Sequence, residues 1–140
     1  MLDPGSLESA LTTLLLDSHA LQWWSAEPDR LSRPATEAIE GADELVVASI
    51  SWFELAWLAE HQRILVSVPV RAWLAQLTEL VRTVVISPAV AATAAALPAS
   101  FPGDPADRLI YATALEHGWQ LVTKDQRMRR HPQPRTVTVW

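Results

Sequence analysis

Leu14-Leu-Leu-Asp17 is the stretch that decides the fold of this chain. The apolar run predicts a short buried strand over Thr13–Leu16, and the residues from Asp17 to Trp24 predict the helix that follows it. Four further runs of this kind predict strands at Leu45–Ala48, Val81–Ile86, Gln120–Thr123 and Thr136–Trp140. Because strands that alternate with helices form parallel sheets covered on both faces, we expect a three-layer α/β/α sandwich with a central, mostly parallel five-stranded sheet.

The segments between these strands have helical spacing and capping signals. They predict helices at Pro34–Glu40, Ser49–Gln62, Pro69–Leu80, Pro88–Leu97, Asp104–His117 and Asp125–Arg130. Residues 1–13 show no clear period before the first strand and predict a loose N-terminal arm. No internal linker or repeat interrupts the remainder, so we expect residues 14–140 to form a single domain.

The composition is that of a globular chain. Of its 140 residues, 49% are hydrophobic and 19% are charged, and cysteine is absent. The absence of cysteine removes disulfide and thiolate chemistry and suits a reducing compartment. No apolar run approaches the ~20 residues that a membrane span needs, and acids interrupt the N-terminus where a signal peptide would be apolar. We therefore expect a cytoplasmic protein without a membrane partner.

Four acidic residues lie where an expected strand gives way to a helix: Asp17, Glu54, Asp107 and Asp125. The carboxyl ends of parallel strands meet at one edge of a sheet, so we expect these side chains to converge on one pocket. Clustered carboxylates repel one another unless divalent cations neutralise them. The pattern therefore predicts a metal site, with Asp104 as a further candidate ligand.

Helix capping is the alternative explanation for each acid taken singly. Asp17 and Asp125 can cap the helices that follow them, and Asp104 with Asp107 nearly forms a capping box. Capping alone does not require acids at all of these positions, because serine, threonine and asparagine cap equally well. Glu54 is the hardest to explain as a cap. If the helix is capped by Ser49, Glu54 lies one turn inside an apolar helix, where an unpaired carboxylate is costly.

The ligand types indicate which metal binds. Carboxylates are hard oxygen donors, which suit Mg²⁺ or Mn²⁺ rather than a zinc site built from cysteine and histidine. Mg²⁺ sites usually take further ligands from substrate phosphates, so we expect phosphodiester hydrolysis by water that the metal activates.

The basic residues suggest how a nucleic acid could be held. The net charge of −5 argues against bulk attraction to nucleic acid, yet cations cluster near the C-terminus. Expected substrate-binding residues are Ser18, His19, Arg108, Thr123, Lys124 and Arg127, and the whole Lys124–Arg130 cluster could hold phosphates. His131 is expected on the surface. The seven tryptophans predict core packing or a self-association surface.

Four motifs in order resemble the PIN-domain ribonucleases, and especially the VapC-type toxins of bacterial toxin–antitoxin pairs. They are Leu14-Leu-Leu-Asp-Ser-His-Ala-Leu-Gln-Trp-Trp, Ser49-Ile-Ser-Trp-Phe-Glu, Asp104-Pro-Ala-Asp-Arg-Leu-Ile-Tyr-Ala-Thr-Ala and Leu121-Val-Thr-Lys-Asp. The resemblance covers Leu14 to Trp140, nearly the whole chain. It implies a PIN-like fold and a metal-dependent RNA endonuclease.

The resemblance also implies partners and ligands. The partners are a cognate VapB-like antitoxin encoded beside the toxin, an RNA substrate and a second copy of the chain in a homodimer, with operator DNA reached only through the antitoxin. By position, Asp17, Glu54, Asp107 and Asp125 correspond to the family's catalytic metal-binding acids, and Asp104 matches the Asp-Pro-x-Asp-Arg subgroup. Many relatives carry another acid after the last of these, whereas Gln126 and Arg127 stand here.

Two other readings remain open from the residues. One is a metal-dependent phosphatase, although a haloacid-dehalogenase-type enzyme would show Asp-x-Asp where this chain has Asp17-Ser18-His19. The other is a non-catalytic PIN-like module that binds RNA or protein. Such a module would be expected to have lost some of the acids, and all four are present.

Overall fold

Five parallel strands form the centre of the protein. The computed structural model describes residues 11–131 and 137–140, so most of the expected arm at residues 1–13 lies outside the described part. The strands are β1 (Thr13–Leu16), β2 (Glu44–Ala48), β3 (Arg82–Val84), β4 (Gln120–Val122) and β5 (Thr138–Val139). Their order in the sheet is β3-β2-β1-β4-β5, and every neighbouring pair is parallel, so the expected sheet is confirmed.

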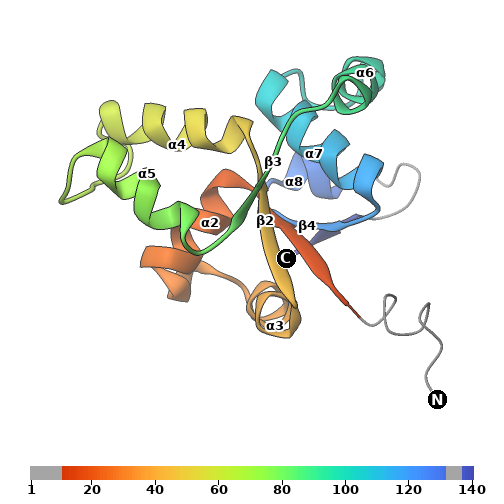
Figure 1. The fold of residues 1–140 in the computed structure, drawn as a ribbon. Helices are drawn as coiled ribbons and strands as arrows, with labels where there is room; N and C mark the ends of the chain where they lie inside the picture. Colours follow the sequence, from red (N-terminus) through yellow and green to blue (C-terminus); the bar gives the residue numbers. More distant parts are fainter. Residues whose placement is uncertain (1–10, 132–136) are drawn as a thin grey trace.

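The helices cover both faces of this sheet (Figure 1). Their bounds are α2 (Ser18–Ala26), α3 (Arg33–Gly41), α4 (Ile50–Glu60), α5 (Val70–Thr78), α6 (Pro88–Ala96), α7 (Pro105–His117) and α8 (Gln126–Arg129). A 3₁₀ turn at Pro28–Arg30 was not anticipated by the sequence reasoning. None of the helices in the described part of the chain is long and apolar enough to cross a membrane.

Alternation along the strands sorts the core into two layers. Leu14 and Leu16 point to one face, where they pack with α2, α3, α4 and α5. Leu15 points to the other face and packs with α7 and α8, while α6 lies outside α7. Each layer buries large aliphatic side chains completely. A strand with both faces covered needs no polar alternation, which explains the continuous apolar run.

The carboxyl ends of the central strands meet at one edge. Leu16 at the end of β1 is in register with Val47 of β2 and Val122 of β4. The backbone N–H of Asp17 donates to the carbonyl of Val122 over 3.1 Å, which ties the residue after β1 to the end of β4. Residues that directly follow β1, β2 and β4 are therefore brought together.

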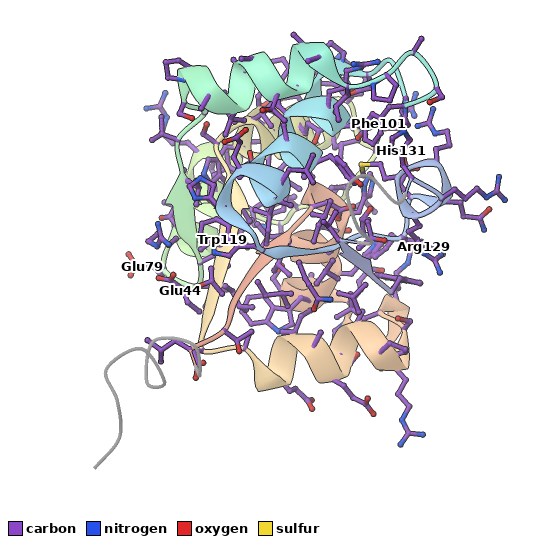
Figure 2. The ribbon with its side chains drawn as sticks, turned by 90° about the vertical axis from the view of Figure 1, so that its right-hand side faces the viewer. Glu44, Glu79, Phe101, Trp119, Arg129 and His131 are labelled. Atoms are coloured by element: carbon purple, nitrogen blue, oxygen red, sulfur yellow. The ribbon has the colours of Figure 1, made fainter. Side chains whose placement is uncertain are left out.

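An aromatic cluster closes the α7 side of the molecule. The Phe101 ring lies 4.7 Å from Tyr111 and 5.1 Å from His131 between ring centroids. Figure 2 shows Phe101 and His131 together on this side of the protein. Tyr111 also donates a hydrogen bond from its hydroxyl to the His131 carbonyl over 2.7 Å. The expectation that His131 is a surface residue was wrong, because its ring packs into this cluster.

Candidate metal centre

Asp17 begins the site at the junction of β1 and α2. It is the N-cap of α2, and its Oδ1 accepts a hydrogen bond from the backbone N–H of Ala20 at 2.7 Å. Its exposed fraction is only 8%. The strand places the residue at the sheet edge, and the cap commits Oδ1 to the helix and fixes the rotamer, while the side chain also hydrogen-bonds Thr123.

Glu54 enters the site from α4. Ser49 holds the N-cap position without a side-chain cap hydrogen bond, and the helix begins at Ile50. Glu54 is therefore its fifth residue and not a capping residue, as expected if the helix starts after Ser49. Ser51 is a fully buried helical residue, so the alternative capping box is not formed. The Glu54 carboxylate accepts a 2.6 Å hydrogen bond at Oε1 from the hydroxyl of Ser18. This bond joins α4 to the first turn of α2 and orients Glu54 toward the site.

Asp104 and Asp107 reach the site from the start of α7. Asp104 is the N-cap, and its Oδ1 accepts from the backbone N–H of Asp107 at 3.1 Å, while Pro105 fills the first helical position. The expected cap is therefore confirmed. Because the two acids are one turn apart, the cap places Asp104 beside Asp107.

Asp125 completes the group as the N-cap of α8. Its Oδ1 accepts from the backbone N–H groups of Arg127 at 2.8 Å and Met128 at 3.2 Å. The fully buried Thr123 accepts from the backbone N–H of Asp125 at 3.1 Å and also hydrogen-bonds the Asp17 side chain. Thr123, which was expected to bind substrate, instead lies beneath the surface and positions two acids.

Capping and ligation are compatible at these positions. Asp17, Asp104 and Asp125 each use Oδ1 for the helix cap. None of these caps involves Oδ2, although Oδ2 of Asp125 accepts from Nη2 of Arg127 at 3.3 Å and the Asp17 side chain also hydrogen-bonds Thr123. The choice between cap and ligand in the sequence reasoning was therefore a false alternative.

The acids form one group at the mouth of a cleft of about 530 Å³. Carboxylate oxygens of Glu54, Asp104 and Asp107 lie within 4.8 Å of one another. Asp17, Glu54, Asp107 and Asp125 line the cleft, together with Ser18 and His19. The structure therefore brings Asp104 closer to the centre than the sequence indicated, and places Asp17 and Asp125 on its flank.

The electrostatic cost of this group is visible in its proton affinities. Burial raises the pKa of Asp107 most, the neighbouring charges of Asp104, Asp125 and Glu54 raise it too, and the combined effect brings it to about 7. Burial also raises the pKa of Glu54, against the opposing hydrogen bond from Ser18. Asp17 behaves in the same way, because burial raises its pKa more than its hydrogen bonds lower it. Raised values at several clustered carboxylates are typical of a functional site.

Arg127 is the cation nearest to the acids. Its Nη2 lies 3.3 Å from Oδ2 of Asp125 and 3.6 Å from Oδ2 of Asp107. Its side chain is 66% exposed, so it reaches the group from the solvent side. This contact lowers the pKa of Asp107, although by less than the other acids raise it.

Trp23, His19 and Lys124 lie together in the lining of the cleft. The ring of the buried Trp23 lies 5.6 Å from that of His19 and 5.6 Å from Nζ of Lys124, measured to its centroid. His19 and Lys124 are exposed and line the cleft, as expected of substrate-binding residues. Sequence reasoning missed Gln126 and the placement of Trp23 in this lining, because nothing local distinguishes either from an ordinary helical residue.

Arg108 is held elsewhere. Its guanidinium donates to the backbone carbonyls that lead from α6 into α7, namely those of Ala94, Leu97, Pro98 and Pro102, over 3.0–3.2 Å. It does not line the acidic cleft. Its position therefore does not support the expected contact with an RNA phosphate, and indicates that it holds the connection between α6 and α7.

The sequence is similar to known proteins over most of its length. Residues 14–133 match the model of the PIN domain. The chain is 72% identical over 130 residues to Ribonuclease VapC22 of Mycobacterium tuberculosis, covering 93% of this chain and 100% of that protein.

Solved structures show the same fold at low sequence identity. The VapBC2 complex from Rickettsia felis, bound to a DNA fragment from its promoter, has a chain 13% identical to this one with a TM-score of 0.67, covering 92% of this chain and 100% of that chain. A toxin–antitoxin complex from Klebsiella pneumoniae has a chain 21% identical with a TM-score of 0.60, covering 81% of this chain and 87% of that chain.

Proposed function

This chain belongs to the PIN-domain family and to its VapC branch, and from that premise we propose that it is a ribonuclease toxin that cuts RNA internally with a divalent cation held by its acidic group. The observation that carries the proposal is the convergence of carboxylates from four separate segments of the chain on one cleft. Nothing in the packing of the fold requires so many acids there, and their raised pKa values indicate that the fold bears a cost for them.

The donor set suits a hard cation. Glu54, Asp104 and Asp107 offer oxygens within 4.8 Å of one another, and the caps of Asp17 and Asp125 use only Oδ1. Neither cysteine nor a histidine cluster is present among them, which favours Mg²⁺, with Mn²⁺ as a second candidate. When bound, such a cation would activate water as the nucleophile and stabilise charge on the phosphate.

The surrounding residues have separate tasks. Ser18 holds Glu54 by its 2.6 Å hydrogen bond, and Thr123 holds Asp17 and the backbone of Asp125. The exposed Lys124 and Arg127 stand at the mouth of the cleft, where they can bind the phosphates that flank the scissile bond. His19 lines the same cleft and can donate to a phosphate oxygen.

We also propose a VapB-like antitoxin and a second copy of the chain as partners. The structural neighbours were solved as toxin–antitoxin complexes, which supports an antitoxin partner. We expect this antitoxin to inhibit the enzyme and to make the contact with operator DNA. The homodimer is supported by an apolar face of α4, where Phe53 is 67% exposed and Trp57 is 43% exposed. These residues line a cleft with Pro105 and Ala106 that adjoins the acidic group at Glu54.

The direct test is cleavage of RNA by purified protein. Wild type and Asp17→Asn are incubated with total bacterial RNA in Mg²⁺, in Mn²⁺ and in chelator, and the 5′ and 3′ ends of the products are mapped. Discrete internal cuts by the wild type in metal alone are expected. Cutting by Asp17→Asn at the wild-type rate, or cutting in chelator, would overturn the proposal.

The same experiment separates the two alternatives. A non-catalytic module would bind RNA without cutting it under any of these conditions. A phosphatase would release phosphate from nucleotide monoesters and leave RNA chains intact. Asp17→Asn is a suitable control because asparagine caps a helix as well as aspartate does, so the fold is retained.

A further inference from the structure

A second cleft lies against the acidic one, between α8 and β5. It measures about 550 Å³ and is lined by residues of these two elements and Trp140: Gln126, Arg129, Arg130, Thr138, Val139 and Trp140. Gln126 also lines the acidic cleft, so the two hollows share a wall and adjoin. Gln126 is therefore the residue at which the two clefts meet.

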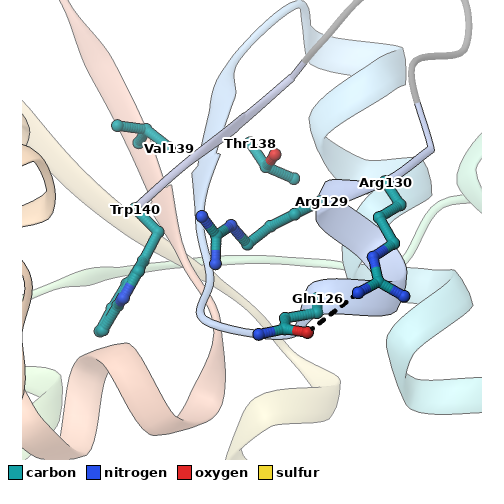
Figure 3. Close-up of a pocket in the computed structure, with 6 residues that line it drawn as sticks. All are labelled: Gln126, Arg129, Arg130, Thr138, Val139 and Trp140. Carbon is teal, nitrogen blue, oxygen red and sulfur yellow. Dashed lines mark hydrogen bonds between the residues drawn. The ribbon is translucent and has the colours of Figure 1, made fainter.

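The charged side chains in the lining of the second cleft are arginines. Arg129 and Arg130 are both exposed, and none of the lining residues in the described part of the chain has a carboxylate side chain. Within residues 11–131 and 137–140, neither arginine forms an ion pair with a side chain, in contrast to Arg127, which pairs with Asp107 and Asp125. Arg130 donates to the amide oxygen of Gln126 at 3.2 Å, as drawn in Figure 3. Within the described part of the chain, both guanidinium groups therefore lack an acidic partner.

The arrangement of charge contrasts with the chain as a whole. The net charge is −5, yet four of its 11 lysines and arginines fall within Lys124–Arg130. Lys124 and Arg127 line the acidic cleft, whereas Arg129 and Arg130 line its neighbour. One turn of helix therefore distributes cations over both hollows. Figure 3 shows the Arg129 side chain extending along β5 toward Trp140, and that of Arg130 on the other side of the turn.

We propose that the cleft between α8 and β5 is a phosphate-binding subsite for the RNA strand on one side of the scissile bond. Arg129 and Arg130 bind successive phosphates as bidentate forks, the Thr138 hydroxyl donates to the strand, and the partly exposed Trp140 walls the path. The subsite rests on the proposed nuclease function, since it lies on the continuation of the acidic cleft. Its two arginines attract RNA locally, although the net charge of the whole chain is negative.

Arginines that contact RNA phosphates and arginines that are only solvated can be distinguished by the salt dependence of RNA binding. Each phosphate neutralised on a single strand contributes about 0.7 to the slope of log affinity against log salt. Loss of two contacts should lower that slope by about 1.4, and should weaken binding roughly tenfold near 0.15 M salt. An effect of this size requires direct phosphate contact.

The experiment measures binding apart from cleavage. All variants carry Asp17→Asn, and a fluorescein-labelled pool of short random-sequence single-stranded RNA is titrated in Mg²⁺ at several salt concentrations between about 50 and 200 mM. The test variant adds Arg129→Gln and Arg130→Gln. The matched control adds Arg33→Gln and Arg71→Gln, which removes the same charge from exposed positions on α3 and α5.

The expected result is a lower slope and weaker binding in the test variant alone, with most of the binding retained by Arg129→Lys and Arg130→Lys. Equal behaviour of test and control variants would overturn the subsite. So would unchanged RNA affinity together with weaker binding of an acidic antitoxin segment, because the cleft would then be a protein site.

Cleavage by proteins with Asp17 intact keeps this inference separate from the proposed function. Raised KM with retained kcat in the arginine variant supports the subsite. If the wild type cuts RNA and the arginine variant has an unchanged KM, the subsite is wrong and the nuclease stands. If the wild type binds RNA by these arginines and cuts nothing, the nuclease is wrong.

Discussion

Asp107→Asn tests the electrostatics of the site most directly, because it removes a charge at the position where the structure makes that charge costly. The pKa of Asp107 is raised from an ordinary value near 3.8 to about 7. The folded protein therefore holds a proton on this group between those two values, whereas the unfolded chain does not. Stability must fall as pH rises through this window, because the unfolded state binds fewer protons.

The magnitude follows from the same shift. One pKa unit corresponds to about 1.36 kcal/mol, so charging Asp107 costs the metal-free fold up to ~4 kcal/mol above pH 7. At pH 5 this charging has lowered the free energy of unfolding of the wild type by only ~1.6 kcal/mol. The stabilisation of Asp107→Asn over the wild type should therefore grow by ~2–3 kcal/mol between pH 5 and pH 8. The ion pair with Arg127 is already included, because it contributes to the pKa of Asp107.

Urea unfolding of the two metal-free proteins at both pH values measures this difference as free energies of unfolding. Addition of Mg²⁺ at pH 8 should then stabilise the wild type and have much less effect on Asp107→Asn, because the cation relieves a repulsion that the variant lacks. A stability difference that is the same at pH 5 and pH 8 would refute the reasoning. Asp29→Asn, at an exposed acid in the 3₁₀ turn, is the matched control and should show no such growth.

Three further predictions concern other parts of the site. Ser18→Ala removes the hydrogen bond that orients Glu54 and should weaken Mg²⁺ binding about 10–100-fold in a thermal-shift titration, with equal affinity contradicting that role. Arg108→Met removes the guanidinium hydrogen bonds to four backbone carbonyls and should lower the free energy of unfolding by ~3 kcal/mol, while a stable variant with weaker RNA binding would show that Arg108 contacts the substrate. Phe53→Glu with Trp57→Glu should convert a dimer to a monomer in analytical ultracentrifugation, and a dimer that persists would place the interface elsewhere.

The sequence predicted the elements well because each strand is a bounded apolar run between helices with capping signals. Leu14, Leu15 and Leu16 could only be a strand buried on both faces, and Gly118 ends α7 in the left-handed conformation that favours glycine, with φ of 69°. The bounds of the elements differ by a few residues from those expected. β3 stops at Val84 rather than Ile86, because strand pairing with β2 ends at Ala48.

The convergence of the acids could be predicted, but the partners of the other polar residues could not. Arg108 follows Asp107 directly and seemed available to a phosphate, yet it turns to the carbonyls before α7. Thr123 precedes Lys124 and Asp125, and it points beneath them. Which side of a helix start or strand end a side chain faces depends on residues far along the chain, and a local motif does not contain that information.

The acids at the strand ends illustrate how one position serves stability and chemistry together. A serine at Asp17, Asp104 or Asp125 would cap its helix about as well and would bring no repulsion. The carboxylates are nevertheless grouped so closely that burial and mutual repulsion hold a proton on Asp107 near neutral pH. Because the caps use Oδ1 and fix each rotamer, the remaining oxygens are held in place before any cation arrives. The helix starts thus hold the carboxylates in place for a cation. Because a bound cation relieves the repulsion between these carboxylates, the free energy of that repulsion strengthens cation binding.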